Sequence, residues 1–311
     1  MWPLLHIAAP DHPGFEDEEP QGISILIEQL RHDVRPVLAT DVDEDLGSRE
    51  SARATGLVPP GRQKVRRYGV SIALPVMSAE QEASWFGLFH LAKNVPEGWT
   101  LVGGQMVHLH CAERGVEPYR STPDVDAVLD VRGHPQILMT VTSALADAEF
   151  EPRGLTASGK QHRWVRGHAT IDVLIPAFTG QPGRGVGASG YPGLATPGAI
   201  YALRRSEPVE VTVGDTTGTV RRPTLLGALV IKSAAYSITV DPHRNRHLDD
   251  LALLASMLTA RDLRGAELSK GEAKYVREAV PVAQGHLAAT VIDGAPDGLS
   301  RLARLVERSP A

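Results

Sequence analysis

The chain has 311 residues, of which 42% are hydrophobic and 22% charged, and its net charge at pH 7 is −5. These values are ordinary for a soluble enzyme of one large or two modest domains, and no apolar run approaches the roughly 20 residues that cross a bilayer. The single cysteine, Cys111, excludes an internal disulfide and a CxxC zinc or redox pair. The first residues lack the basic segment of a secretory signal, so we expect a cytoplasmic protein without a membrane partner.

Charge is uneven along the chain. Residues 1–60 carry twelve Asp and Glu against four Arg, a local charge of −8, which leaves +3 for the rest. Two segments in this region are rich in proline or in acidic and small residues, which is typical of flexible chain. We expect an N-terminal extension over 1–75, a core domain over 76–222 and a helical domain over 223–311.

The core begins with a clear helix signal. Ser78, with Gln81 three residues later, forms a capping-box pattern ahead of an apolar run. The sequence WTLV at 99–102 predicts a short buried strand, and Gly103-Gly104 predicts a tight turn. A helix is then expected until Gly115.

The segment RSTPDVDAVLDV, residues 120–131, alternates acidic and apolar residues. Because successive side chains of a strand point to opposite faces, a strand here would place Asp124, Asp126 and Asp130 on one face. Such a face is more often solvated than metal-binding. A helix is predicted after it, from Pro135 to Ala146.

The segment HRWVRGHATIDVLIP, residues 162–176, predicts a strand or hairpin with one buried side. We expect Val165, Ile171 and Val173 on the apolar face and Asp172 on the polar face. A β-hairpin is expected within 209–222, and helices from Pro223 onward. The order of elements predicts an α/β or α+β fold, with a mixed sheet flanked by helices and a mainly helical C-terminal part.

Three features then fall in an order that indicates phosphate chemistry. The pair Gly103-Gly104 would let the backbone approach a phosphate at a helix N-terminus. Carboxylates at positions i and i+2 of one strand face, Asp124 and Asp126, can share hard cations such as Mg²⁺. A third carboxylate, Asp172, would complete a two-metal site for phosphoryl or nucleotidyl transfer.

Together these residues resemble the nucleotidyltransferases with a DNA-polymerase-β-like core, most closely the AbiEii and MenT type toxins. The resemblance covers about residues 78–260 and consists of LVGG at 101–104, R-x-T-x-D-x-D at 120–126 and DVL at 172–174. It implies two Mg²⁺ ions and an NTP substrate whose NMP is transferred to a hydroxyl acceptor. It further implies a tRNA 3′ end as the acceptor and a winged-helix antitoxin as the partner of a toxin.

The resemblance also implies roles for individual residues. The three carboxylates would hold the metal ions, with Asp172 orienting or deprotonating the attacking hydroxyl. The residues implied to contact the nucleotide or its phosphates are Gly103, Gly104, Gln105, Arg120, Thr122 and Asp250. Asp250 matches an acid of the family's closing D-x-x-D-like motif, whose first acid is here replaced by His247.

Lys232 lies on an apolar helix face, where a lysine must either extend its charge to water or meet an anion. The family has a lysine on the equivalent helix near the triphosphate, which implies that Lys232 neutralises the leaving pyrophosphate. The residues themselves leave both interpretations open.

Several other interpretations remain or are excluded. Transfer to a small hydroxylated molecule such as an aminoglycoside, and a catalytically silent nucleotide-binding protein, are the alternatives. The pattern G-x-G-x-x-G at 185–190 is flanked by prolines, so no Rossmann helix can follow it. His108, His110 and Cys111 do not share a helix face, which favours a structural role. The basic segment 61–67 and the pairs Arg204-Arg205 and Arg221-Arg222 are most simply interpreted as solvated surface residues. Contact of these residues with a nucleic-acid backbone is the alternative.

Overall fold

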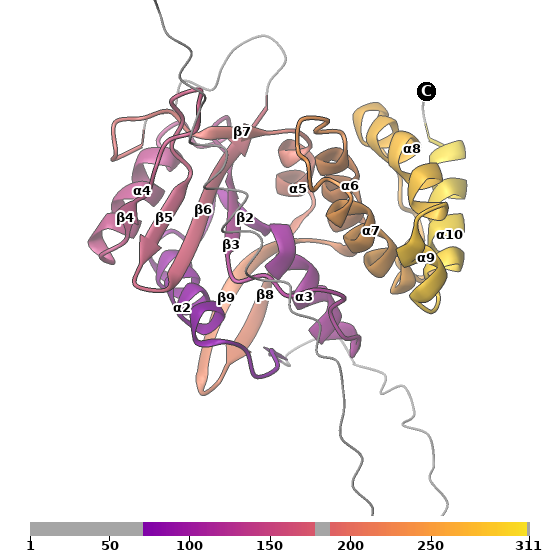
Figure 1. Cartoon of the computed structure of the whole chain (residues 1–311), viewed down its shortest axis with the longest axis horizontal. Coiled ribbons are helices and arrows are strands. Elements are labelled where there is room, and N and C mark those ends of the chain that lie inside the picture. Colours follow the sequence, from indigo (N-terminus) through magenta and orange to yellow (C-terminus); the bar gives the residue numbers. More distant parts are fainter. Residues whose placement is uncertain (1–70, 178–186, 310–311) are drawn as a thin grey trace, which may run out of the picture. The chain divides into compact units, whose positions relative to one another are not determined.

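The computed structural model describes residues 71–177 and 187–309, and all of them belong to one compact unit that spans 60–311 (Figure 1). The expected extension over 1–75 lies almost wholly outside the described residues, as do the basic segment 61–67 and part of the glycine pattern at 185–190. The described part mixes helices with two sheets, so the prediction of an α/β fold is confirmed. None of its helices is both long and apolar enough to cross a membrane.

The larger sheet has the strand order β2-β3-β6-β5-β4, and β7 pairs with β6. Its strands are β2 (Trp99–Val102), β3 (Val125–Leu129), β4 (Glu151–Pro152), β5 (Arg163–Arg166), β6 (Ala169–Pro176) and β7 (Leu194–Thr196). The central strands β3 and β6 are parallel, whereas β2 and β5 run antiparallel to their neighbours. The sheet is therefore mixed, as the sequence predicts, and its middle is the β3–β6 pair.

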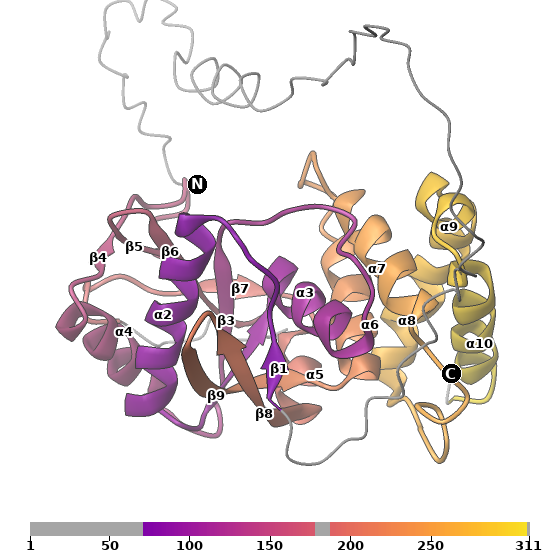
Figure 2. The same cartoon turned by 90° about the horizontal axis from the view of Figure 1, so that it is seen from below.

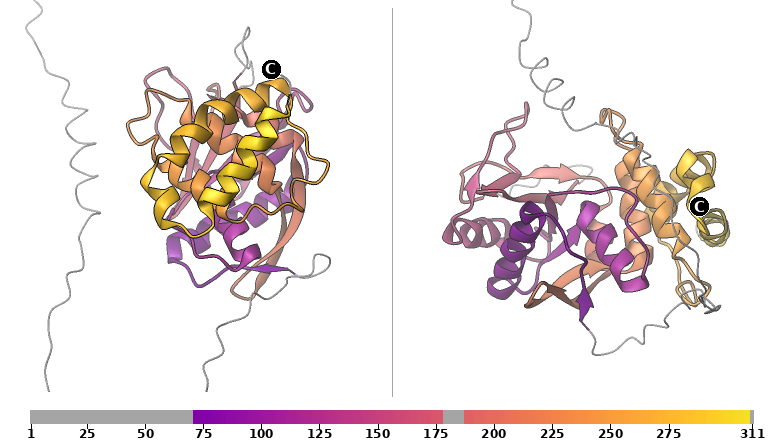
Figure 3. Two further views of the ribbon diagram at one scale, coloured as in Figure 1. Left: turned by 90° about the vertical axis from the view of Figure 1, so that its right-hand side faces the viewer. Right: turned by 60° about the horizontal axis from the view of Figure 1, so that its bottom comes forward.

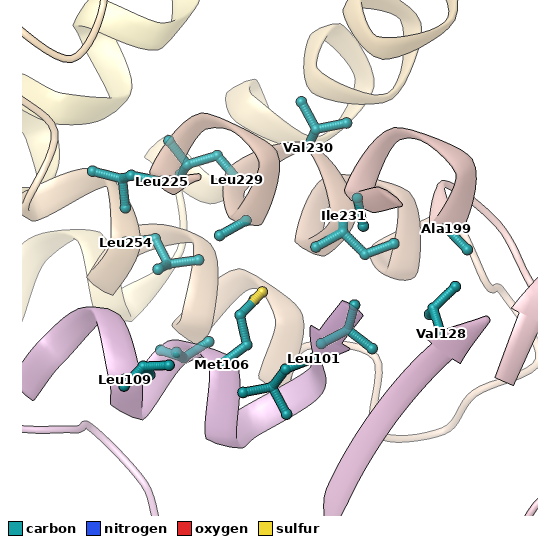
Figure 4. Close-up of a cluster of buried hydrophobic side chains, with 14 of the residues drawn as sticks. Leu101, Met106, Leu109, Val128, Ala199, Leu225, Leu229, Val230, Ile231 and Leu254 are labelled. Atoms are coloured by element: carbon teal, nitrogen blue, oxygen red, sulfur yellow. The ribbon is translucent and has the colours of Figure 1, made fainter. Parts of the chain in front are cut away.

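Helices cover both faces of this sheet. On one face lies α2 (Ala79–Asn94). Its Gly87 packs against β6, so closely that a Cβ there would lie 3.0 Å from the Ile171 side chain. The helix α4 (Ile137–Asp147) packs beside α2. On the other face lies α5 (Ala199–Arg204), and Val128 of β3 points toward its Ala199 (Figure 4). Asp126 and Val128 are two residues apart on β3, so their side chains point to the same face of the sheet, the one covered by α5.

A smaller three-stranded sheet has the order β1-β8-β9. The hairpin of β8 (Ser206–Val213) and β9 (Thr216–Pro223) matches the prediction, and β1 (Ile72–Ala73) adds to β8 in parallel. Gly218 of β9 packs so tightly on α2 that a Cβ would lie 2.6 Å from the ring of Phe89. The small sheet is thereby fixed to the helix layer.

The chain after β9 is helical, as predicted. It forms α6 (Leu225–Tyr236), α7 (Arg246–Ser256), α8 (Lys270–Gln284), α9 (Leu287–Val291) and α10 (Ala295–Glu307). Nearly all of α6 is buried, because it lies between the sheet side and the outer helices; Figures 2 and 3 show α8 and α10 beyond α6 and α7. The helix α10 approaches α7 so closely that a Cβ on Gly298 would meet the carbonyl oxygen of Ala255 at 1.7 Å.

Three details differ from the sequence expectations. The helix α3 (Gly103–Arg114) includes both glycines, so they form its first residues and not a separate turn. The strand β3 is shorter than 120–131, with Asp124 just before it and Asp130 just after it. In β5 the buried residue is Trp164, while Val165 is only partly buried. The expected face of Val165 is wrong because the chain turns at Gly167-His168 and resets the alternation.

Candidate active site

The three carboxylates expected to act together meet on the α5 face of the larger sheet. Asp126 of β3 stands directly opposite Asp172 of β6 in the parallel pair. Asp124 lies two residues before Asp126 and so on the same side of the chain. The side chain of Asp172 is only 9% exposed, whereas that of Asp124 is 30% exposed. The parallel pairing thus brings together residues that are 46 positions apart in the sequence.

Arg163 lies among these carboxylates and is the site residue that the sequence analysis missed. It stands opposite Asp172 in the β5–β6 hairpin. Its Nε donates to Asp172 Oδ1 at 2.9 Å and its Nη2 to Asp172 Oδ2 at 2.8 Å. The same Nη2 lies 3.4 Å from Asp124 Oδ2. The hydrogen bonds to Asp172, followed by the charges of the acids, raise the pKa of the Arg163 guanidinium.

Asp126 differs from its two neighbours because, within the described residues, its carboxylate accepts no hydrogen bond. Burial, together with the charges of Asp124 and Asp172, raises the pKa of Asp126 from 3.8 to about 7. The positive charges of Lys232 and Arg163 oppose this rise without cancelling it. A third negative charge in the cluster is therefore disfavoured unless a further cation joins it.

The glycine pair lets the start of α3 approach this cluster. Gly103 has φ +69°, and a Cβ there would lie 1.7 Å from Asp126 Oδ2. A Cβ on Gly104 would lie 2.4 Å from the Thr122 Cγ2 atom. Any side chain at either position would displace a neighbouring site residue. The first N–H groups of a helix have no partner within the helix, so this terminus offers donors beside the carboxylates.

Hydrogen bonds fix the segment that precedes β3. Gln105 is buried; its Oε1 accepts from Trp85 Nε1 at 3.0 Å and its Nε2 donates to the Thr122 carbonyl at 2.6 Å. Gln81 Nε2 donates to the same carbonyl at 2.9 Å. Thr122 Oγ1 in turn donates to Asp124 Oδ1 at 2.7 Å. The Gln105 amide is thus engaged within the fold, and Thr122 orients Asp124.

A second charged cluster joins the segment before β3 to the helical part. Asp250 of α7 accepts two hydrogen bonds from Arg120, at 3.1 and 2.8 Å, and one from Lys232 Nζ of α6, at 2.7 Å. Lys232 is buried and meets a carboxylate, so it does not extend to water. Burial would raise the pKa of Asp250, but Lys232 and Arg120 outweigh it and lower the pKa to about 2.

His247 occupies the position where the family motif has its first acid. Burial, followed by the charge of Lys232, lowers the pKa of His247 to about 3. Its Nδ1 is buried, and no described residue forms a hydrogen bond with it. The imidazole is therefore neutral at pH 7, and Asp250 is the carboxylate that balances Lys232 and Arg120.

The remaining sequence candidates lie outside these clusters. His108 Nε2 is 2.8 Å from the Arg120 carbonyl, His110 Nε2 is 3.1 Å from the Pro223 carbonyl, and Cys111 is buried with a pKa raised by burial to about 12. In each arginine pair one member forms an internal ion pair: Arg205 with Glu272 and Arg222 with Glu113. The other members, Arg204 and Arg221, line a cavity of about 490 Å³ together with Asp130.

Proteins similar to this chain are found among solved structures. No protein-family model matches the chain, and no curated protein sequence matches it. Among solved structures, an antigenic nucleotidyltransferase-like protein from Paracoccidioides brasiliensis is similar, with 15% sequence identity and a TM-score of 0.43. The similarity covers 74% of this chain and 94% of that chain.

Proposed function

We propose that the protein is a Mg²⁺-dependent nucleotidyltransferase that transfers an NMP from an NTP to a hydroxyl acceptor. The observation that carries the proposal is the meeting of Asp124, Asp126 and Asp172 on one sheet face, with the start of α3 against them. The same residues carry the sequence resemblance to nucleotidyltransferases. Acids on paired strands beside open helix N–H donors suit a phosphate chain and its cations.

The donor set fits Mg²⁺ in chemistry. All three side chains offer carboxylate oxygens, which this ion prefers. Asp126 accepts no hydrogen bond from the described part of the chain and has a pKa raised to about 7. Within the described residues no three His, Cys, Asp or Glu side chains are arranged around a common metal position. The Arg163 guanidinium stands between Asp172 and Asp124, so metal binding by these residues requires it to move. When bound, Mg²⁺ would polarise the reacting phosphate and neutralise charge on the leaving pyrophosphate.

The chain's own residues would position the reactants. The N–H groups at Gly103, Gly104 and Gln105 would hold phosphate oxygens, and Thr122 keeps Asp124 oriented. Asp172 would orient the attacking hydroxyl and accept its proton. Catalysis would then come from positioning and from positive charge placed where negative charge develops.

Lys232 and Arg120 would supply fixed positive charge next to the carboxylates. Asp250 holds both side chains, and the charge of Lys232 is felt at Asp126, whose pKa it lowers. We propose that Lys232 stabilises the pyrophosphate as it leaves. Arg120 would support the same charge from the segment before β3.

We propose a tRNA 3′ end as the hydroxyl acceptor. The resemblance favours a tRNA 3′ end, a toxin role and a winged-helix antitoxin as partner, and the arginines at the Arg204 and Arg221 cavity are compatible with a nucleic acid. Transfer to a small hydroxylated molecule is the alternative among enzymes. A catalytically silent nucleotide-binding protein is favoured by one observation, the Arg163 side chain lying among the carboxylates.

Incubation with Mg²⁺, each α-labelled NTP and total tRNA tests the proposal. Label on tRNA with the wild type, and none with Asp126→Ala, is the expected result. Asp147→Ala is the matched control, since it removes an exposed acid at the end of α4, outside the carboxylate cluster and the Arg204 and Arg221 cavity, and should retain transfer. Label on small hydroxylated acceptors alone would favour the alternative. If no acceptor becomes labelled and the protein binds no NTP, the proposed nucleotidyltransferase activity is refuted.

A further inference from the structure

Arg163 supplies a cation inside the acidic cluster. It satisfies both oxygens of Asp172 and also contacts Asp124 Oδ2. The other oxygen of Asp124 accepts from Thr122. All four oxygens of these two carboxylates are thus engaged, whereas Asp126 accepts no hydrogen bond from any residue that the structure describes.

A guanidinium and a divalent ion cannot both occupy this position. Magnesium requires oxygens at about 2.0–2.1 Å around the ion, and a second cation between the same carboxylates would be repelled. Asp172 is held by both oxygens in a planar, bidentate pair, a geometry specific to arginine. Metal binding at Asp124 and Asp172 must therefore break the ion pairs of Arg163.

The Arg163 side chain has water within reach. It is 42% exposed, so its guanidinium can be hydrated once the ion pairs break, whereas the Asp172 side chain, 9% exposed, would exchange the guanidinium for the divalent ion. Arg166, on the same strand, provides a contrast. It donates to the Ala148 carbonyl and stacks on the ring of Phe150, 4.8 Å from its centroid, away from the acids.

We propose that Arg163 is a built-in counter-ion that competes with divalent cations for Asp124 and Asp172 and so sets the metal affinity of the site. The proposal rests on the proposed function, because it assumes that these acids are metal ligands. In the metal-free protein Arg163 relieves the repulsion between the carboxylates. On metal binding the guanidinium is displaced toward solvent.

Titration of Mn²⁺ without nucleotide, followed by electron paramagnetic resonance, tests the proposal on the full-length protein. Arg163→Ala should bind Mn²⁺ about tenfold more tightly than the wild type, because the competing charge is gone. Arg166→Ala is the matched control, since it also removes one positive charge from β5, and should stay within about twofold of the wild type. Equal affinities in the two variants would overturn the proposal.

Arg163→Lys provides a second test that retains the charge and so guards against loss of folding. A lysine cannot form the bidentate pair with Asp172, so this variant should bind Mn²⁺ more tightly than the wild type; an unchanged affinity would count against the proposal. If the wild type transfers nucleotides while neither variant binds Mn²⁺ more tightly, this inference alone fails. If the variants bind more tightly but the wild type transfers no NMP, the proposed function alone fails.

Discussion

Replacing Asp250 by asparagine removes the carboxylate that pairs with both Lys232 and Arg120. The Asp250 side chain is 3% exposed and that of Lys232 is 4% exposed, so the substitution leaves the Lys232 ammonium buried without its counter-ion. Arg120, 29% exposed, loses its bidentate partner in the same substitution. The substitution also loosens the connection of α6 and α7 to the segment before β3.

The expected cost follows from the ion pairs. The pKa of Asp250 falls from 3.8 to about 2 on folding, and a shift of roughly two pKa units corresponds to about 2.5 kcal/mol. Removing one partner of a buried pair costs about 3–5 kcal/mol, because the other charge stays buried without compensation. We therefore expect Asp250→Asn to lose about 3 kcal/mol of unfolding free energy at pH 7.

The pH dependence of this cost follows from the depressed pKa. A lowered carboxyl pKa stabilises the fold above the unfolded pKa near 4 and loses that contribution as pH falls toward 2. The difference between the variant and the wild type should accordingly be constant above about pH 5 and shrink below pH 4.

Urea unfolding followed by circular dichroism, at pH 7 and at pH 3, measures both effects. Asp249→Asn is the control, since Asp249 precedes Asp250 on α7 and is paired with His286 at 3.4 Å with 24% of its side chain exposed. Burial, ahead of the other contributions, raises the pKa of Asp249, so its loss should change stability by less than about 1 kcal/mol. A cost for Asp250→Asn below that of the control would refute the account of this cluster.

Two further predictions concern the carboxylate cluster. Gly103→Ala should lower the free energy of unfolding by about 2–4 kcal/mol, because it combines a positive φ with a clash against Asp126. The control Gly115→Ala has φ +65° and no atom within 4 Å of its Cβ, so it should lower the free energy of unfolding by only about 1–2 kcal/mol. Equal losses in urea unfolding would contradict the close approach of Gly103 to Asp126. Because its pKa is raised to about 7, Asp126 is protonated more readily in the folded state, so the stability of the wild type should fall as pH rises from about 4 to 7. Asp126→Asn should remove this fall and be more stable than the wild type at pH 8, and parallel thermal-unfolding profiles would show the pKa to be unshifted.

Local patterns predicted the elements that carry the site. The capping box at Ser78 and Gln81 is present, and α3 ends at Gly115 in the left-handed conformation, because both signals act within one helical turn. The alternation of apolar and acidic residues identified β3, and the later strand with Asp172 followed from the same periodicity of two.

Arg163 could not be recognised from residue type, because its role arises from pairing. A two-residue turn at Gly167-His168 places Arg166 opposite Ala169 and hence Arg163 opposite Asp172. The signal in the sequence is thus the two-residue turn, which sets the hairpin register that pairs Arg163 with Asp172. The contact between Lys232 and Asp250 is different, since it depends on the packing of α6 against α7, which no local pattern encodes.

The position of the transferred label tests the central claim most directly. In parallel reactions with Mg²⁺ and a mixture of tRNA and small hydroxylated acceptors, the NTP carries radioactive phosphorus at either the α or the γ position. Nucleotidyl transfer predicts that the acceptor gains only the α label and that the γ label is released as pyrophosphate, with neither event in Asp126→Ala. Transfer of the γ label to the acceptor, or no release of pyrophosphate with any NTP, would contradict the account.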